Sequence, residues 1–413
     1  MKYLKLIGVL LMLATFEGIV TSCSDEEEDQ NDTILVNPGG TASGGHVFEA
    51  LDVTSFYLDH IKYSFAGDCL VVTGYDKTEF NGNAVIPSCV SFSGKKYIVT
   101  EIGESAFQDC KSLTSISLPK TLTQIGDHAF TRCTSLTSIA IPAHVSKIGK
   151  YAFHMCESLS RAEFASIEHL CSIKFETNTS NPLFYAHHLY IKGREVRDVT
   201  IPNGTTEIAQ FTFWGCSAMT SVFIPESVTE IGQEAFHDCS GLTSIRLPNH
   251  LTNIGKYAFA QCTGLTSLAI PESVTIIYSF AFSGCENLVS ISIPDGEIVI
   301  GSFVFEYCRS LTSITLPQGI SVIYPLTFDG CTSLRSITIP SSVTQIRETA
   351  FYGCVNIKEI VSLIEHPFAI GQAFTDIYDS ATLYVPVGSM DEYKATEGWN
   401  RFQNIVEGMK AIR

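Results

Sequence analysis

Cysteine, phenylalanine and proline each recur at an interval of 23 residues along most of this 413-residue chain. The recurring cysteines form two ladders, Cys110, Cys133 and Cys156, and then Cys216, Cys239, Cys262, Cys285, Cys308, Cys331 and Cys354. A phenylalanine precedes each cysteine by three residues, and prolines follow the same period from Pro119 to Pro142 and from Pro202 to Pro340. A unit this short cannot bury its apolar side chains alone, so the units must stack as the coils of a solenoid.

One unit, residues 113–133, predicts the structure of a coil. Apolar residues alternate with serines up to Pro119, which indicates a short strand that ends where proline cannot donate a ladder hydrogen bond. A second apolar stretch follows at residues 122–125, and a glycine then turns the chain. We expect residues 129–130, Ala and Phe, on a brief helical or 3₁₀ turn, and Cys133 as a small buried residue that closes the coil.

The repeated pattern LTSIxIPxSVTxIGxxAFxxC resembles the BspA-type leucine-rich repeat, a family of bacterial and protist cell-surface proteins. Residues 46–100 contain IPSCVSFSGKKYIVTEIGESAF and resemble the N-terminal β cap of that family. Residues 382–413 begin with TLYVPVGSMDEYKATEGWNRFQNIVE and resemble its C-terminal cap. Caps are expected because an open solenoid end exposes core and strand edges.

The predicted fold is therefore an α/β solenoid of mostly short β-strands with brief helical or 3₁₀ turns, capped at both ends, with its repeats over residues 101–381. An irregular long repeat interrupts the period at residues 160–200, where two consecutive ladder prolines lie 60 residues apart. This segment resembles a long repeat common in the same family. We expect an extended coil with a hairpin whose turn is Lys192–Gly193.

The N-terminus has the features of an export signal. Lys2 and Lys5 flank the start of an apolar run at residues 6–16, which is 11 residues long and too short to span a bilayer as a helix. Residues 1–22 are predicted to be a signal peptide that resembles those of bacterial lipoproteins, with Cys23 as the lipidated residue. The alternative is an ordinary signal peptide that happens to contain a cysteine.

Residues 23–45 are predicted to form an acidic, flexible tether. Its acidic run at residues 25–29 is either a solvated part of the tether or a signal similar to the export signal of surface-exposed lipoproteins. We therefore expect an exported outer-membrane lipoprotein, exposed at the cell surface, that contacts the membrane through its lipid anchor only.

The charge and the motifs of the chain argue against several functions. The formal net charge is −17 and basic residues do not cluster, so nucleic acid is not an expected partner. The sequence has no G-x-S-x-G elbow, phosphate loop or H-E-x-x-H motif, so we expect neither an enzyme nor a cofactor. His169, Cys171, His187 and His188 are residue types that bind metals, but their spacing matches no closed zinc pattern, so no metal site is expected.

The cysteine count of 14 in an exported chain raises the question of disulfide bonds. The ladder cysteines occupy one repeat position, so we expect a column of buried, reduced thiols. Cys69, Cys89 and Cys171 lie outside the ladders, and a bridge between Cys69 and Cys89 stays open as an alternative.

Two departures from the repeat mark candidate partner-binding residues. The outward positions of the first strand are mostly serine, threonine or alanine, but Phe223 and Arg246 occupy them on adjacent coils. Large aromatic and guanidinium groups anchor interfaces, although a chance substitution is the alternative.

The second departure is in the following apolar stretch. A column of polar residues becomes Ile276, Val299 and Val322 on three consecutive coils, and Tyr278 and Tyr324 replace glycines two positions later. If this column faces solvent, it is an apolar stripe typical of a partner surface; if the coils twist, it belongs to the core. Both departures fall on coils five to nine, counting the irregular one, where we predict the binding face.

These features predict a cell-surface adhesion protein that binds other proteins. The family resemblance implies attachment to proteins of a host or of neighbouring cells. The alternative, a glycan-binding accessory surface lipoprotein, would require aromatic platforms with paired polar groups on one face.

Overall fold

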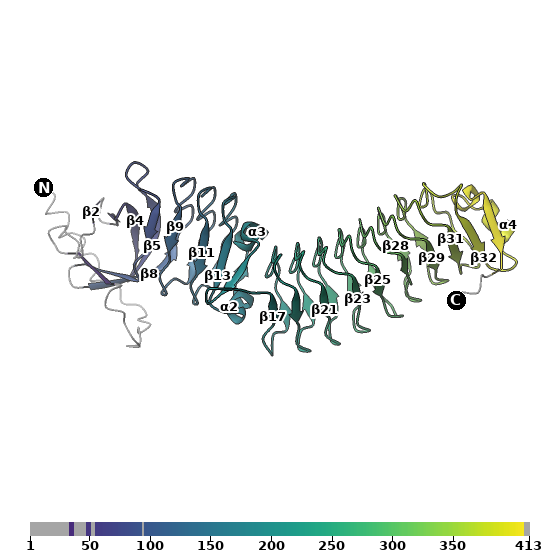
Figure 1. Cartoon of the computed structure of the whole chain (residues 1–413), viewed down its shortest axis with the longest axis horizontal. Helices are drawn as coiled ribbons and strands as arrows, with labels where there is room; N and C mark the ends of the chain where they lie inside the picture. Colours follow the sequence, from purple (N-terminus) through teal and green to yellow (C-terminus); the bar gives the residue numbers. More distant parts are fainter. Residues whose placement is uncertain (1–32, 37–46, 51–53, 93–94, 409–413) are drawn as a thin grey trace. The chain divides into compact units, whose positions relative to one another are not determined.

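The computed structural model describes residues 33–36, 47–50, 54–92 and 95–408. Cys23, the predicted signal peptide and the acidic run therefore lie outside the described residues. The chain divides into two compact units, Met1–Arg194 and Glu195–Arg413. The predicted fold class is confirmed: the chain forms a leucine-rich-repeat β-solenoid of about 13 turns with few short helices (Figure 1).

The first unit begins with antiparallel strands that lead into the coils. These strands are β2 (Phe48–Ala50), β3 (Ser55–Leu58), β4 (Ile61–Ala66) and β5 (Cys69–Tyr75). β5 pairs in parallel with β8 (Lys95–Ile102), whose other edge pairs with β7 (Cys89–Phe92), and β1 (Thr33–Val36) pairs with β7. β8 then continues into the parallel row β10 (Gln124–Ile125), β12 (Lys147–Ile148) and β14 (Lys174–Phe175). One sheet thus joins the N-terminal strands to the second strands of the coils in the first unit.

The register of this sheet excludes a Cys69–Cys89 disulfide. Cys69 is the partner of Ile98 on one side of β8, and Cys89 is the partner of the same Ile98 on the other side. Two strand spacings separate their Cα atoms by roughly 9.5 Å, whereas a disulfide needs less than about 7 Å.

The first strands of the coils form separate parallel rows in the first unit. β6 (Asn83–Val85) pairs with β9 (Ser115–Ser117), and β11 (Ser138–Ile141) pairs with β13 (Arg161–Phe164). β13 pairs in turn with β15 (Leu189–Ile191), and β15 is followed in the sheet by β16 (Arg194–Glu195). The predicted hairpin turn is confirmed, because Lys192 and Gly193 have φ angles of 49° and 75° between β15 and β16. The irregular repeat also contains α2 (Ile167–Ser172), η4 (Asn178–Ser180) and α3 (Leu183–Ala186), which the sequence analysis did not anticipate.

The second unit repeats the same coil more regularly. Its first strands are β17 (Asp198–Thr200), β19 (Ser221–Phe223), β21 (Ser244–Arg246), β23 (Ser267–Ala269), β25 (Ser290–Ser292), β27 (Ser313–Ile314), β29 (Ser336–Ile339), β31 (Glu359–Ser362), β32 (Thr382–Val385) and β33 (Asn404–Glu407). Its second strands are β18 (Glu207–Ile208), β20 (Glu230–Ile231), β22 (Asn253–Ile254), β24 (Ile276–Ile277), β26 (Val299–Ile300), β28 (Val322–Ile323) and β30 (Gln345–Ile346). The short helices α4 (Met390–Ala395) and η5 (Trp399–Arg401) lie near its C-terminal end.

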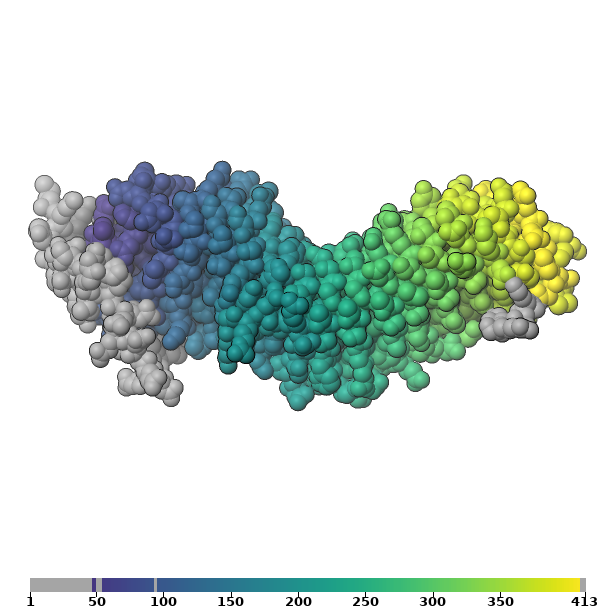
Figure 2. All heavy atoms as spheres, in the orientation of Figure 1, coloured from purple at the N-terminus to yellow at the C-terminus, as the bar shows by residue number. Residues whose placement is uncertain are grey.

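The ladder phenylalanines form the centre of the core in each unit. In the second unit they stack in order from Phe213 to Phe374, with ring centroids 4.6 to 6.0 Å apart and interplanar angles of 2° to 16°. Trp399 and Phe402 contact the last ring, and in the first unit Tyr75 stacks on Phe107. The space-filling view shows successive coils packed against one another on the face drawn (Figure 2), and each coil depends on its neighbours to bury its apolar side chains.

The ladder cysteines are buried, as predicted, and each one after the first in its ladder donates a hydrogen bond. Cys262 Sγ lies 3.1 Å from the carbonyl oxygen of Phe236 in the preceding coil. The same oxygen accepts the backbone N–H of Cys239 at 3.3 Å. Burial raises the pKa of the ladder thiols from Cys110 to Cys331, to about 12 at Cys156 and Cys285. The column therefore consists of protonated thiols that act as donors.

The segment at residues 129–130 is a series of tight turns rather than a helix. Thr131 N donates to His128 O within the coil, at 3.0 Å, but Phe130 N donates to Ala152 O of the next coil, at 2.8 Å. His128 and Arg132 have φ angles of 56° and 61°, which interrupts any helical run. The helical expectation is wrong here because bonds between coils replace bonds within a helix.

Candidate functional site

Phe223 and Arg246 lie side by side on the first-strand row of the second unit. They are register partners on β19 and β21, and the Phe223 side chain is 57% exposed. Arg246 Nη2 lies 3.1 Å from Glu226 Oε1, and Glu226 Oε2 accepts the backbone N–H of Asn249 at 2.7 Å. The guanidinium is therefore paired with an exposed carboxylate beside an exposed aromatic ring.

The second predicted column faces away from the core. Ile276 and Val299 are register partners on β24 and β26, and Val322 holds the same position on β28. Val299 is 49% exposed, while Ile276 and Val322 are half-buried. The next residue of each strand is a buried isoleucine, so the pleat directs this column outward. Of the two alternatives left by the sequence, the solvent-facing stripe is correct.

The tyrosines that replace glycines extend the stripe along the chain. Tyr278 follows β24 and is 46% exposed, and Tyr324 follows β28 and is half-buried. At the glycine that keeps this position in the intervening coil, Gly301, a Cβ atom would lie only 2.7 Å from Ser279 N. Both tyrosines therefore add aromatic surface at a position where the other coils bring their backbones into close contact.

The two departures do not share one surface. Phe223 and Arg246 belong to the sheet β17-β19-β21, whereas Ile276 and Val299 belong to the sheet β18-β20-β22-β24-β26. The expectation of a single binding face on coils five to nine is therefore wrong. Each coil has two strands that run along different sides, and the two departures lie on different strands.

A third group of aromatic residues, missed by the sequence analysis, borders the stripe. Tyr257, Phe280 and Phe303 stack with ring centroids 4.4 Å apart and interplanar angles of 16° and 9°. All three are half-buried and have positive φ angles between 56° and 63°. They lie two residues before successive ladder phenylalanines, so comparing that column of the repeat would have revealed them.

The stripe, together with Phe280 and Phe303 of this aromatic group, forms what we call the uncharged face, residues 275–280, 298–303 and 321–326. Tyr257 borders it in the preceding coil. The three segments contain no Asp, Glu, Lys or Arg. The equivalent segments on either side are charged, with Lys256 in the preceding coil and Arg347 and Glu348 in the following one. Aromatic enrichment and loss of charge inside a polar rim are typical of the core of a protein interface.

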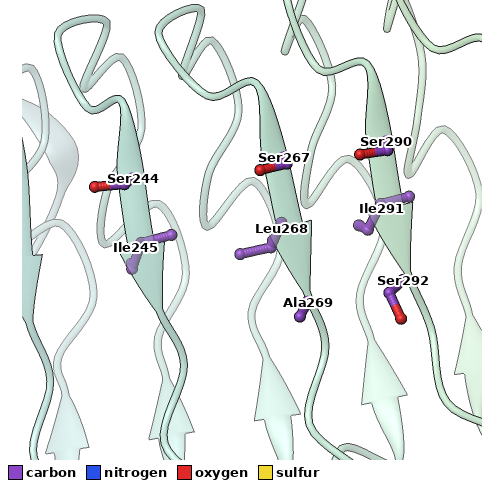
Figure 3. A pocket seen from close by; sticks show the side chains of 8 residues that line it. All are labelled: Ser244, Ile245, Ser267, Leu268, Ala269, Ser290, Ile291 and Ser292. Atoms are coloured by element: carbon purple, nitrogen blue, oxygen red, sulfur yellow. The ribbon is translucent and has the colours of Figure 1, made fainter.

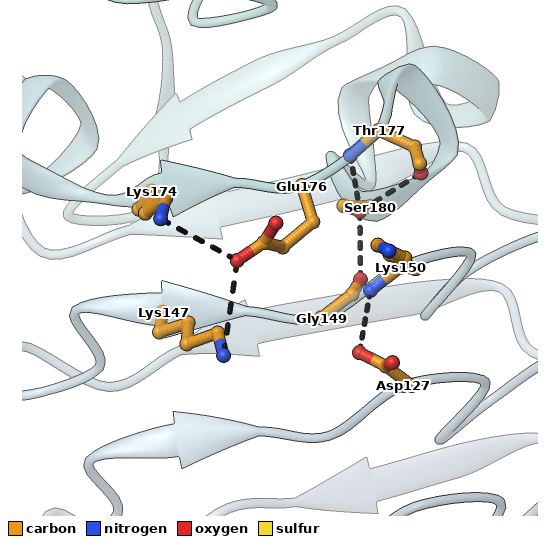
Figure 4. Close-up of polar contacts among 8 residues, drawn as sticks. All are labelled: Asp127, Lys147, Gly149, Lys150, Lys174, Glu176, Thr177 and Ser180. Atoms are coloured by element: carbon orange, nitrogen blue, oxygen red, sulfur yellow. Dashed lines mark hydrogen bonds and ion pairs between the residues drawn. The ribbon is translucent and has the colours of Figure 1, made fainter.

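The same side of the coils is charged in the first unit. Lys147 Nζ and Lys174 Nζ lie 3.7 and 3.6 Å from Glu176 Oε1 (Figure 4). Lys147 occupies the repeat position that Ile276 and Val299 hold in the second unit. The repeat therefore accepts a charge at this position, and the uncharged face is not required by the fold.

A shallow groove of about 370 Å³ lies on the first-strand row of the second unit. Ser244, Ser267 and Ser290 line it at equivalent positions on three consecutive strands (Figure 3). Its apolar lining comes from Ile245, Leu268 and Ile291. The groove lies where β21 and β23 belong to different sheets. Its hydroxyl groups belong to the small-residue pattern of the repeat.

The histidines and cysteine of the irregular repeat have structural surroundings. His169 is buried, its Nε2 donates to Val145 O at 3.0 Å, and its Nδ1 accepts Ala165 N–H at 3.4 Å. Burial raises the pKa of Cys171 to about 12. His187 ends α3 in a left-handed conformation, with φ 53°. Across the described ranges, the ligand atoms of His169, Cys171, His187 and His188 form no convergent group.

Among the residues that the structure describes, no helix is long and apolar enough to cross a membrane.

Comparisons with known proteins agree with this architecture. The chain is similar to a leucine-rich cell-surface protein of Faecalibacterium prausnitzii, with 26% identity, a TM-score of 0.51, and coverage of 86% of this chain and 95% of that one. It is also similar to a leucine-rich repeat protein of Bacteroides ovatus, with 25% identity, a TM-score of 0.54, and coverage of 86% and 100%. The comparison with curated proteins gives no significant match. The model of the BspA type leucine-rich repeat region matches residues 91–183, 186–298 and 252–378, and the chain therefore belongs to this family.

Proposed function

We propose that this protein is a cell-surface adhesion protein that binds another protein through the uncharged face. The observation that carries the proposal is the absence of charged residues from the three equivalent segments 275–280, 298–303 and 321–326 of consecutive coils, together with exposed Tyr278 and Val299. Exposed apolar groups favour aggregation unless they serve an interface. The charged equivalents in the first unit indicate that the repeat itself does not require an apolar surface there.

The arrangement of the aromatic rings favours a protein partner over a glycan. Sugars stack on exposed ring faces, but the faces of Tyr257, Phe280 and Phe303 cover one another at 4.4 Å. The aliphatic side chains of the stripe, among them exposed Val299, suit the apolar side chains of a protein. Phe223, with Arg246 beside it, is the residue pair around which the glycan alternative can be tested.

The cellular location follows from the same proposal. The F. prausnitzii relative is described as a cell-surface protein. We infer that the present chain reaches the surface of the outer membrane through lipidation of Cys23, with residues 23–45 as the tether. Its partner is then a protein of a host or of a neighbouring cell.

The test compares two lysine substitutions in matched positions. Val299 lies on the uncharged face and Val355 lies elsewhere on the second unit, and each is 49% exposed. Lysine already occupies both repeat positions in other coils, as Lys147 and Lys111. V299K and V355K should therefore keep the melting temperature of the wild type.

Surface proteins captured by the wild-type chain provide the ligand for affinity measurements. V299K should weaken binding by at least about tenfold, because a charge would be buried without a partner, and V355K should bind like the wild type. Equal binding by V299K would contradict the proposal. F223S, measured in parallel on the same ligand and on a glycan array, tests the first-strand row separately.

A further inference from the structure

Three side chains of metal-ligating type converge near the N-terminal end of the first unit. They are His60, in the turn between β3 and β4, and Asp76 and Glu79, in the loop after β5. One ligand atom from each lies within 4.8 Å of the other two, and His60 Nδ1 is 3.6 Å from Glu79 Oε2. From this geometry we propose that the N-terminal cap binds one divalent transition-metal ion, such as Zn²⁺, through His60, Asp76 and Glu79.

The backbone holds the two loops together independently of any ion. Asp76 N donates to His60 O at 2.7 Å, directly beyond the register pair Ile61–Tyr75 of β4 and β5. Asp76 Oδ1 accepts both the N–H and the hydroxyl of Thr78, at 2.8 and 2.6 Å. These bonds, together with one from the backbone N–H of Glu79, orient the Asp76 carboxylate. They also lower the pKa of Asp76, so the group is ionised at neutral pH.

The distances suit a first-row ion after a small adjustment. Zn²⁺ binds imidazole nitrogen and carboxylate oxygen at about 2.0–2.2 Å, which places tetrahedral ligand atoms roughly 3.4 Å apart. His60 Nδ1 and Glu79 Oε2, 3.6 Å apart, already have that spacing within a few tenths of an ångström. Glu79 is 69% exposed along its side chain and can rotate toward the other two. Three protein ligands leave a fourth position for water or for a group of a bound partner.

One imidazole with two carboxylates selects the class of ion. Imidazole suits zinc, copper, nickel and iron, whereas calcium and magnesium prefer oxygen ligands alone. No sequence motif marks this site, because Asp76 lies 16 positions after His60 and the pairing of β4 with β5 brings them together.

The turn also supplies a variant that removes a ligand without disturbing the fold. His60 has a φ angle of 64° and follows Asp59, at 49°, in a two-residue hairpin turn. Glycine is the preferred residue at such a position, so H60G should fold at least as well as the wild type. E79Q removes a second ligand from an exposed side chain. The control is E392Q, which disrupts the exposed pair His366–Glu392, 3.2 Å apart, where the described residues offer no third ligand.

The experiment is isothermal titration of ZnCl₂ into the full chain without a histidine tag, followed by melting curves with and without Zn²⁺. We expect one saturable site in the wild type and in E392Q. H60G and E79Q should each weaken it by at least about tenfold, since even outer-shell partners contribute 10- to 100-fold to metal affinity. Zn²⁺ should raise the melting temperature of the wild type more than that of H60G.

Unchanged affinity in H60G would overturn the proposal, as would the absence of saturable binding in the wild type. Tighter binding of Ca²⁺ or Mg²⁺ than of Zn²⁺ would contradict the assigned class of ion. Adhesion through the uncharged face does not depend on this result, because V299K and H60G alter different units.

Discussion

Replacing one ladder thiol measures how much the cysteine column contributes to the stability of the second unit. Cys285 is fully buried, and its Sγ lies 3.2 Å from the carbonyl oxygen of Phe259. That oxygen also accepts Cys262 N–H at 3.2 Å. In C285A the carbonyl therefore keeps its backbone donor, and the loss is confined to packing and to one weak S–H bond.

The magnitude for C285A follows from three contributions. Losing a group about the size of a methylene from the interior costs about 0.8 kcal/mol. A cavity of roughly 25 Å³ adds about 0.6 kcal/mol, and the lost hydrogen bond adds about 0.5 kcal/mol. The free energy of unfolding should therefore fall by about 2 kcal/mol. For a unit of this size, that lowers the melting temperature by roughly 4–8 °C.

C285S tests the hydrogen bond separately. The hydroxyl of the serine can donate to the Phe259 carbonyl, so it should not be left without a hydrogen-bond partner. C285S should therefore lower the free energy of unfolding by no more than C285A does. Urea unfolding followed by circular dichroism, with equal m-values for the variants, measures both changes. A cost for C285S clearly above that of C285A would refute the assigned hydrogen bond. A cost below about 0.5 kcal/mol for C285A would refute tight packing of the column.

Three further predictions follow. Alkylation of the native protein at neutral pH should leave the ladder thiols unmodified and free after denaturation, because they are buried and burial raises the pKa of Cys239 and Cys262; mass spectrometry that found disulfides among Cys239, Cys262 and Cys285 would contradict this. Burial lowers the pKa of His169, so the unfolded state takes up a proton at a higher pH than the folded state does. The free energy of unfolding should therefore decline below about pH 6.5, and the decline should be smaller in H169Q. Identical pH profiles for H169Q and the wild type would show that His169 does not cause the decline. Wild type should enter the detergent phase and C23A should not, if Cys23 carries the lipid; equal partitioning into water would rule out the anchor.

The regular coils could be predicted from the sequence because each depends on its nearest neighbours. The period of 23 identified the stacked Phe236 and Phe259, the buried Cys262 and the short strands that carry them. The turn at Lys192–Gly193 was predictable because a glycine in a two-residue connection favours positive φ. These features follow from local residue preferences repeated in register.

What the sequence missed depends on register between segments. The distance between Cys69 and Cys89 follows from their common partner Ile98, and neither cysteine is near the other in the chain. Tyr257 and Phe280 stack at a repeat position that varies in sequence and that Ser105 holds in the first coil. The consensus of the repeat therefore gives no aromatic residue at this position. Likewise, the placement of the two departures on different sheets required the strand pairing.

The hydrogen bonds from the ladder thiols to the carbonyls of the preceding coil limit how genes of this kind can change length. Each bond joins a cysteine to the phenylalanine 26 residues earlier, which is one period plus the three residues between the two ladders. Unequal recombination that removes a whole period from the second unit would bring Phe236 against Phe282 and Cys285 against the Phe236 carbonyl, and every side chain would regain an equivalent neighbour. Each duplication would lengthen the unit by roughly 4.8 Å, whereas an in-frame deletion of any other size would leave a coil without its donors. Alleles of such a gene should therefore differ in length by multiples of 69 nucleotides, a repeat-number polymorphism that alters reach while preserving the fold.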